Sequence, residues 1–205
     1  MKALIIVDIQ HDFLPGGALA VKDGDLIIEP VNKLMEHFPL IVATQDWHPA
    51  DHLSFASNHP SASPGDVIDL EGLPQVLWPD HCVQGSVGAA FAETLDTSKI
   101  DKIFRKGENR HIDSYSGFFD NGKKQDTGMY AYLKKQQIDE VFVVGLATDY
   151  CVKFTAIDAA ALGLKTSVIA NATKAVNLKP GDGDMALKQM SSLGIGVVDS
   201  TTYLI

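Results

Sequence analysis

Three residues that could together carry out nucleophilic hydrolysis stand at or just after the ends of apolar runs. They are Asp8, Lys106 and Cys151, the last within the segment Gly145–Val152. A cysteine thiolate attacks carbonyl carbons, a carboxylate can take the thiol proton, and an ammonium group favours both anions. The product would be a thioester, which a water activated by Asp8 would hydrolyse. Each residue also has a plainer interpretation, as a loop cap, a solvated strand end and a structural cysteine respectively.

A second group of residues has the composition of a metal site. Asp46 and His48 alternate in an extended segment, so their side chains leave the same side of the chain, and His81 returns from a long loop. One carboxylate and two histidines that leave coordination positions open are typical of a catalytic zinc, iron or manganese ion. Asp51 and His52 are near enough to be a further ligand or partners of the ligands. The alternative is a set of loop histidines bonded to the backbone, but their position after a strand favours the metal.

Other side chains near these two groups are also candidates. Cys82 adjoins His81 and competes with Cys151 as nucleophile, but no helix is expected to begin at Cys82. Phe13 and Trp78 would wall a flat aromatic substrate, or else pack in the core or in a lid. The remaining histidines are expected at the surface or in loops: His11, His37, His59 and His111.

Strands and helices that alternate along the chain must position these residues. Strands are predicted at 2–9, 40–44, 102–106, 140–144, 165–170 and 195–198. Helices are predicted at 30–38, 86–95, 127–137, 148–162 and 184–193. This alternation predicts an α/β fold in a single domain, residues 1–205, with a six-stranded, mostly parallel sheet covered by helices on both faces. In such layered sheets the site lies beyond the carboxyl ends of the strands, where Asp8, Lys106 and Cys151 stand.

The nucleophile candidate is expected in the first turn of a helix. Thr148 is a natural N-cap, which makes Cys151 the third helical residue. There the unpaired N–H groups and the helix dipole would favour a thiolate. Gly163 is expected to end the helix.

Two long irregular segments interrupt the pattern. Residues 45–85 hold five of the nine prolines, four of the seven histidines and both tryptophans, and a second loop covers 107–126. Long irregular segments inside a compact domain are usually functional. Parts of them, 49–65 and 107–125, are candidates for a lid over the site.

Composition excludes several classes of protein. A net charge of −9 over 205 residues argues against a nucleic-acid surface, and no apolar run is long enough to cross a membrane. Two cysteines without an export signal favour free thiols in a reducing cytoplasm. Neither a Gly-x-Gly-x-x-Gly turn nor a Walker A loop is present, so a dinucleotide or P-loop site is not expected. A homo-oligomer remains open.

The chain resembles the nicotinamidases of the isochorismatase-like cysteine hydrolase superfamily. Six segments in the family order carry the resemblance: Val7–Phe13, Thr44–Pro49, Trp78–Val83, Lys106–Gly107, Asp113–Ser116 and Gly145–Val152. The resemblance implies hydrolysis of nicotinamide to nicotinate and ammonia in NAD salvage, and hydrolysis of pyrazinamide as well. It implies Cys151 as nucleophile, Asp8 as general base and Lys106 as their cationic partner.

The resemblance further implies the surroundings of the substrate. One divalent ion, zinc before iron or manganese, would sit on Asp46, His48 and His81 and hold the pyridine nitrogen. A cis peptide between Leu146 and Ala147 would turn the Ala147 N–H, beside that of Cys151, into an oxyanion hole. The substrate-binding side chains would be Phe13, Trp78 and Tyr115. Some relatives use a fourth protein ligand, and His52 is the nearest candidate for it.

Two alternatives stand beside this hypothesis. One is a relative that acts on isochorismate or a carbamoyl compound. The paired histidines and Trp47 argue against it, because many relatives lack the metal site. The other is a non-catalytic zinc-binding or scaffolding protein, which would leave the Asp8, Lys106 and Cys151 set without a role.

Overall fold

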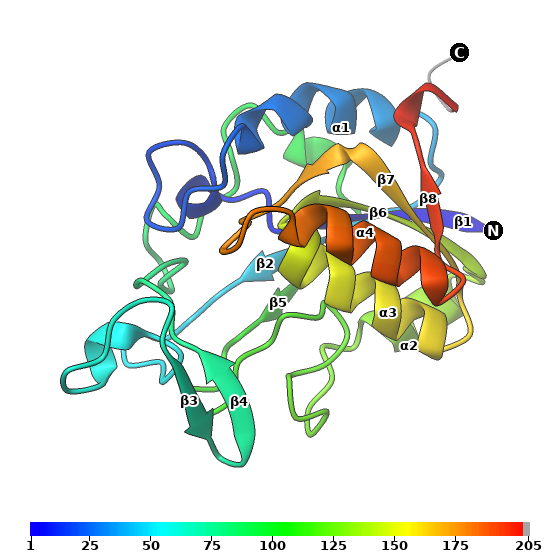
Figure 1. Cartoon of the computed structure of the whole chain (residues 1–205). Coiled ribbons are helices and arrows are strands. Elements are labelled where there is room, and N and C mark those ends of the chain that lie inside the picture. The colour runs from blue at the N-terminus through cyan, green and yellow to red at the C-terminus, as the bar shows by residue number, and fades with distance from the viewer. Residues whose placement is uncertain (203–205) are drawn as a thin grey trace.

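The computed structural model describes residues 1–202 and is built around a six-stranded sheet (Figure 1). All of its neighbouring strands are parallel, in the order β5-β2-β1-β6-β7-β8. The strands are β1 (Lys2–Val7), β2 (Ile41–Asp46), β5 (Lys102–Lys106), β6 (Glu140–Leu146), β7 (Lys165–Lys174) and β8 (Gly196–Val198). The predicted α/β class and six-stranded parallel sheet are therefore confirmed, and β5 has the predicted bounds.

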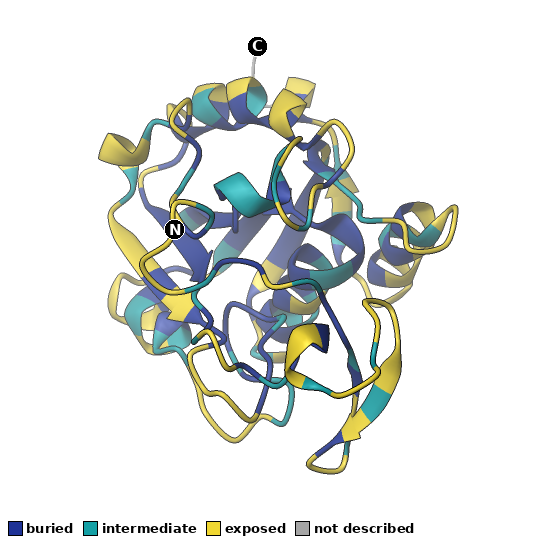
Figure 2. Ribbon diagram, turned by 90° about the vertical axis from the view of Figure 1, so that its left-hand side faces the viewer, coloured by how far each residue is buried: buried dark blue, intermediate teal, exposed yellow. Residues whose placement is uncertain are grey.

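Helices cover both faces of the sheet, because side chains alternate along each strand. On β1, Leu4 and Ile6 pack toward α1 (Ile28–Met35), whereas Ile5 and Val7 lie in the second core cluster. That second cluster is formed with α2 (Met129–Lys135), α3 (Lys153–Ala161) and α4 (Asp182–Ser192). Figure 2 shows the buried strands enclosed by elements whose outer surfaces are exposed.

The helix predicted at 86–95 is wrong. These residues form turns whose backbone bonds to the loop after β1: the N–H groups of His11 and Asp12 donate to the carbonyls of Ala90 and Gly88. Gly88 allows this approach, since a Cβ there would lie 2.0 Å from the Asp12 carboxylate. Pairing with a distant loop has replaced the local helical bonds.

The segment 45–85 contains a hairpin that was not predicted. β3 (Val67–Leu70) and β4 (Leu73–Val76) pair antiparallel across Glu71 and Gly72, whose φ angles are 53° and 85°. Two positive φ angles are what a tight turn with the twist of a hairpin requires. The hairpin projects from the sheet beside the strand ends (Figure 1) and leaves most of its residues partly or fully exposed.

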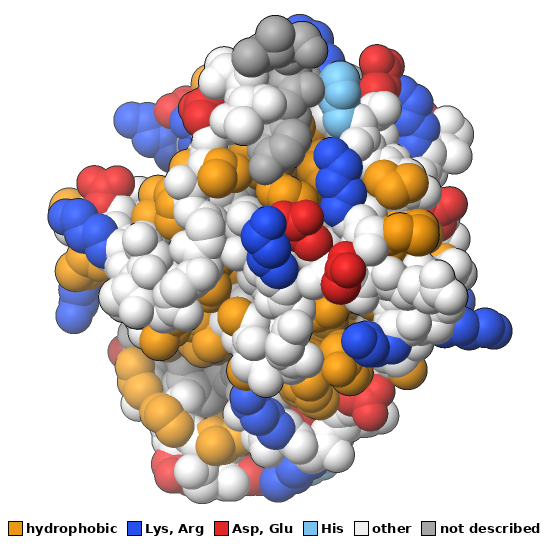
Figure 3. All heavy atoms as spheres, turned by 90° about the vertical axis from the view of Figure 1, so that its right-hand side faces the viewer, with side chains coloured by type: hydrophobic (Ala, Val, Ile, Leu, Met, Phe, Trp, Pro, Cys, Tyr) orange, Lys and Arg blue, Asp and Glu red, His pale blue; other side chains and the backbone are white. Residues whose placement is uncertain are grey.

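None of the helices within residues 1–202 combines the length and apolar character that crossing a membrane needs. On the face shown in Figure 3, acidic, basic and hydrophobic side chains are intermingled, and the basic ones form no stripe.

Candidate active site

The structure brings Asp8, Lys106 and Cys151, hereafter the catalytic set, together at the carboxyl edge of the sheet. Asp8 follows β1, Lys106 is the last residue of β5, and Cys151 lies just beyond β6. The Lys106 Nζ is 3.0 Å from the Asp8 Oδ2 and 3.5 Å from the Cys151 Sγ. All three side chains are buried. Topology accounts for the meeting, because β1 lies between β2 and β6, and β5 pairs with β2.

The turn that carries Cys151 differs from the expected helix start. Thr148 is not the N-cap; that position falls on Ala147, and Thr148–Val152 forms a single π-helical turn before α3. The N–H groups of Tyr150 and Val152 both donate to the Ala147 carbonyl, so the wider turn replaces side-chain capping. Helix α3 ends before Gly163, whose φ is 83°, as expected. The Leu146–Ala147 peptide bond is cis, as the resemblance implied.

Lys106 is the electrostatic centre of the site. Its Nζ also lies 2.9 Å from the Asp46 Oδ1 and 2.9 Å from the Ser114 carbonyl oxygen. Burial opposes the charge, but the carboxylates of Asp46 and Asp8 outweigh burial and raise the pKa of Lys106 well above its usual value. Lys106 therefore stays an ammonium that joins the nucleophile, the base and the Asp46 carboxylate.

Burial of Cys151 opposes the thiolate that the helix start was expected to favour. Burial raises the pKa of Cys151 well above its usual value, and Lys106 only partly opposes the rise. Burial also raises the pKa of Asp8, again against Lys106. A thiol beside a carboxylate of raised pKa is suited to proton transfer between the two groups.

Asp46, His48 and His81, hereafter the candidate metal site, converge on one point. The Asp46 Oδ2 lies 2.9 Å from the His48 Nε2 and 3.3 Å from the His81 Nε2. Each ring uses its Nδ1 on a backbone carbonyl, of Gly107 at 2.9 Å and of Pro79 at 2.7 Å. Those bonds make each Nδ1 a donor and direct both Nε2 atoms toward Asp46, which is how metal-ligating histidines are arranged. The residues present therefore fit a divalent ion.

His52 belongs to a neighbouring cluster rather than to this one. Its ligand atoms group with those of His48 and Asp113. The Ser54 N–H donates to the His52 Nδ1 at 3.1 Å, and the buried Nε2 has no hydrogen-bond partner among residues 1–202. Burial and the neighbouring His48 lower the pKa of His52 to about 4, so the ring is neutral near pH 7.

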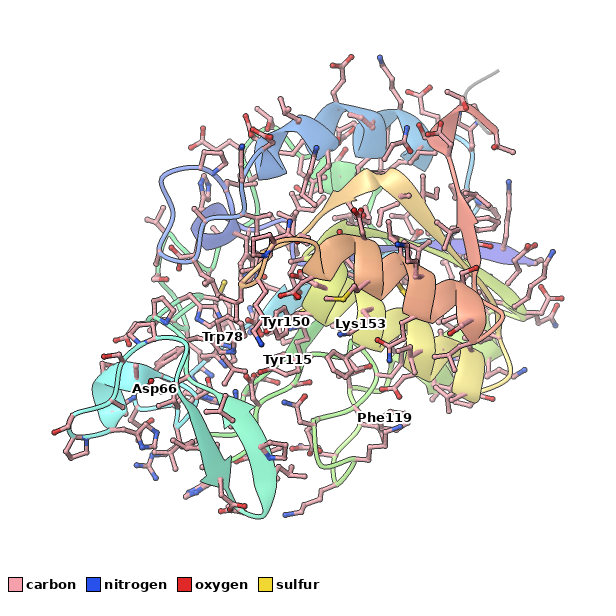
Figure 4. All side chains as sticks on the ribbon, viewed as in Figure 1. Asp66, Trp78, Tyr115, Phe119, Tyr150 and Lys153 are labelled. Carbon is pink, nitrogen blue, oxygen red and sulfur yellow. The ribbon has the colours of Figure 1, made fainter. Side chains whose placement is uncertain are left out.

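A small cavity joins the two groups. Its wall includes Cys151, Asp46 and the three predicted substrate-binding residues Phe13, Trp78 and Tyr115. The Trp78 Nε1 donates to the Tyr115 hydroxyl at 3.2 Å, and Figure 4 shows both rings beside Tyr150. Cys82 does not line the cavity: it is fully buried, and its N–H donates to Asp12.

Sequence patterns did not single out three residues that shape the site. Asp113 lines the cavity, and its Oδ1 is 4.0 Å from the His48 Nε2. Gln10 bonds with both backbone groups of Asp46 at 2.8 Å. Thr44 donates to the Asp8 Oδ1 at 2.6 Å. Each lies in a matching family segment, which was the only available signal, because their partners are distant in sequence.

The parallel sheet and the buried site at its carboxyl edge define a hydrolase of the α/β class. The chain belongs to the isochorismatase family, whose isochorismatase domain model matches residues 2–202.

Similar proteins within this family are amidases by name. A nicotinamidase from Escherichia coli (strain K12) is 48% identical over 197 residues, 94% of this chain and 92% of the relative. A solved Acinetobacter baumanii nicotinamidase and pyrazinamidase is 46% identical, with a TM-score of 0.95 over 98% of this chain and 97% of that chain. A Pyrococcus horikoshii pyrazinamidase solved in complex with zinc is 37% identical, with a TM-score of 0.78 over 97% and 98%.

Proposed function

We propose that this protein is a metal-dependent cysteine amidase that hydrolyses nicotinamide to nicotinate and ammonia. The observation that carries the proposal is the position of one ammonium group, Lys106, within 3.5 Å of the Cys151 sulfur, the Asp8 carboxylate and the Asp46 carboxylate. Nucleophile, base and metal carboxylate thus surround one cation, and the nucleophile and the metal carboxylate line the cavity. Relatives named nicotinamidase at 48% and 47% identity support the same substrate.

The catalytic set would act in two halves. Asp8 takes the proton of the Cys151 thiol, and the thiolate attacks the carboxamide carbon. The N–H groups of Ala147 and Cys151 hold the oxyanion, and ammonia leaves with the proton that Asp8 returns. Asp8 then deprotonates a water that attacks the thioester, which releases nicotinate and restores the thiol.

The candidate metal site would orient the substrate. Asp46, His48 and His81 would hold the ion, for which zinc is the first choice because a similar pyrazinamidase was solved with zinc. A bound divalent ion supplies a Lewis acid that can hold a pyridine nitrogen. Fixing the ring in this way directs the carboxamide toward Cys151, and orientation of this kind lowers a barrier by at most about 7–11 kcal/mol.

The cavity wall suggests which further substrates fit. Phe13, Trp78 and Tyr115 would flank a flat ring, so pyrazinamide, which keeps a ring nitrogen, should be hydrolysed too. A free thiol nucleophile requires reducing conditions, so we place the enzyme in the cytoplasm, in NAD salvage.

The first test is ammonia release from nicotinamide by the zinc-loaded protein. We expect turnover in the wild type, none in Cys151→Ala, and retained turnover in Cys82→Ala, which removes the other thiol. Release by Cys151→Ala would refute the mechanism. If the wild type released no ammonia from nicotinamide but did release it from another aromatic amide, that amide would replace nicotinamide as the proposed substrate.

Metal content is the second test. His48→Ala should lose bound zinc, because it removes one of the two Nε2 atoms that face Asp46. His59→Ala removes a histidine bonded to the Leu53 carbonyl outside the cluster, and should keep it. Equal zinc content in both variants would remove His48 from the ligands.

A further inference from the structure

The two oxygens of the Asp8 carboxylate have different surroundings. The Oδ1 accepts a 2.6 Å hydrogen bond from the Thr44 hydroxyl. The Oδ2 lies 3.0 Å from the Lys106 Nζ but receives no aligned hydrogen bond within residues 1–202. Asp8 is fully buried. One oxygen is therefore held and the other is left able to accept a proton.

Competition at Lys106 explains why the Oδ2 stays available. An ammonium group has three hydrogens. Its Nζ has four neighbours, with Asp46, Ser114 and Asp8 at 2.9, 2.9 and 3.0 Å and the Cys151 sulfur at 3.5 Å. Its three hydrogens are engaged by Asp46, Ser114 and the Cys151 sulfur, so none is aligned on the Oδ2.

Packing fixes the direction of the Thr44 hydroxyl. Thr44 is fully buried on β2, and a β-branched side chain there has few allowed rotamers. Its methyl group lies against Gly117, where a Cβ would be only 2.6 Å away. With the methyl in that space, the hydroxyl faces Asp8. Gly117 is itself held by the Thr155 hydroxyl, which accepts its N–H at 2.9 Å.

We propose that Thr44 is a positioning residue for the general base: its hydroxyl holds the Asp8 Oδ1 and so presents the Oδ2 to the Cys151 thiol. The torsion of a carboxylate about its last bond is broad and roughly two-fold, so the carboxylate needs such a partner to keep one orientation. The proton moves from sulfur to the Oδ2 and later to the leaving ammonia, while the bond from Thr44 to the Oδ1 persists in both states. The inference rests on the proposed function for its chemistry, but not for its test.

The test compares Thr44→Val with Thr44→Ser. Valine keeps the shape and removes the donor, whereas serine keeps the donor and removes the methyl. Alkylation of Cys151 by iodoacetamide, followed by mass spectrometry of its peptide, measures activation of the thiol without any amide substrate. We expect about a 10- to 100-fold lower alkylation rate in Thr44→Val, the range for losing one hydrogen bond to a charged group. The rate in Thr44→Ser should stay within about threefold of the wild type.

Turnover and metal content complete the test. The kcat for nicotinamide should fall with the alkylation rate in Thr44→Val, with KM and zinc content unchanged. An unaltered alkylation rate in Thr44→Val would overturn the inference. So would equal losses in both variants, which would mean that Thr44 matters only for packing. A wild type that releases no ammonia, yet shows the predicted alkylation pattern, would overturn the proposed substrate and uphold the role of Thr44.

Discussion

The two halves of the site are held in place by different means. The catalytic set stands on strand ends, so the parallel sheet itself brings Asp8, Lys106 and Cys151 together. The candidate metal site takes Asp46 from the end of β2, but His81 comes from a segment without regular secondary structure. Its rings are oriented by backbone carbonyls of irregular segments, that of Gly107 after β5 for His48 and that of Pro79 for His81.

The difference indicates which property a substitution in each half should impair. A group on a strand end moves only if the sheet moves, so substitutions there act on charge and proton transfer. A group held by loop contacts moves when one contact is lost, so substitutions there act on metal affinity. Lys106 belongs to both halves, because it pairs with Asp8 and with Asp46.

Lys106→Met should have the largest effect, because it removes the cation that both halves share. Asp8 would be left as a buried carboxylate without a counter-charge, and Asp46 would keep only its histidine neighbours. Breaking a buried ion pair in this way costs about 3–5 kcal/mol. We expect a loss of that size in the free energy of unfolding, measured by urea denaturation of the metal-free protein. Ammonia release should fall by roughly 10²- to 10⁴-fold.

A second substitution checks the cause of that loss. Asp8→Asn in the Lys106→Met background removes the buried carboxylate charge that has lost its ammonium partner. The double variant should regain part of the stability but none of the activity. A Lys106→Met protein as stable as the wild type would mean that the ammonium contributes nothing to holding the two halves together.

Gln10→Ala should weaken the metal half more than the catalytic half. The Gln10 amide accepts from the Asp46 N–H and donates to the carbonyls of Asp46 and Ala89, at 2.8 to 2.9 Å. Losing the amide leaves buried backbone groups unpaired, which should lower the free energy of unfolding by about 1–3 kcal/mol. Zinc affinity, measured by competition with a chromogenic chelator, should fall about 10- to 100-fold, as for other groups that orient a ligand.

Gln45→Ala is the matched control for that experiment. The Gln45 amide also donates to the Ala89 carbonyl, at 2.9 Å, but among residues 1–202 it makes no hydrogen bond to the Asp46 backbone. Its loss should lower stability by about 1 kcal/mol and leave zinc affinity unchanged. Equal losses of affinity in both variants would make the effect one of general packing.

Gly107→Ala should distinguish two effects: displacement of the His48 ring, which lowers zinc binding, and backbone strain, which lowers stability. A Cβ at Gly107 would lie 2.4 Å from the His48 Cε1, and its φ is 70°. Gly128 has a similar φ of 83° with no atom within 4 Å of its Cβ position. Both alanine variants should lose about 1–2 kcal/mol in urea denaturation from the left-handed backbone. Only Gly107→Ala should also lose zinc. Zinc loss in Gly128→Ala as well would point to strain alone.

The sheet could be predicted because its signals are local. The run Lys102–Lys106 has apolar and β-branched residues bounded by turns, and its strand has those limits. The segment 86–95 fails for the opposite reason: its backbone partners lie near His11 and Asp12, more than 70 residues away in sequence. No window of sequence contains that competition.

The site divides in the same way. Asp8, Lys106 and Cys151 could be selected because strand ends of a parallel sheet meet at one edge. The roles of Gln10 and Thr44 depend on hydrogen bonds across 36 residues of sequence, and neither residue has a distinctive local pattern. Nor could the sequence reveal how deeply Cys151 is buried, which raises the pKa of its thiol against the effect expected of a helix start.

His52→Asn should have the smallest effect, one that depends on pH. The pKa of His52 is lowered from 6.5 to about 4 by burial and by His48, so the folded protein favours the neutral ring. A lowered histidine pKa makes folding stability fall as pH drops below 6.5, because the unfolded chain binds the proton first. Asparagine keeps an acceptor for the Ser54 N–H but does not titrate.

Protonation of His52 in the unfolded chain should lower the free energy of unfolding by roughly 1 kcal/mol at pH 6. This loss should vanish near pH 7.5. Urea denaturation of the metal-free proteins should therefore show the wild type losing that much more stability than His52→Asn between pH 7.5 and pH 6. Parallel pH dependences would mean that the His52 ring is as easily protonated in the folded protein as in the unfolded chain. In that case its buried Nε2 would have to face water or a carboxylate, and Asp113 is the carboxylate within reach of the same cluster.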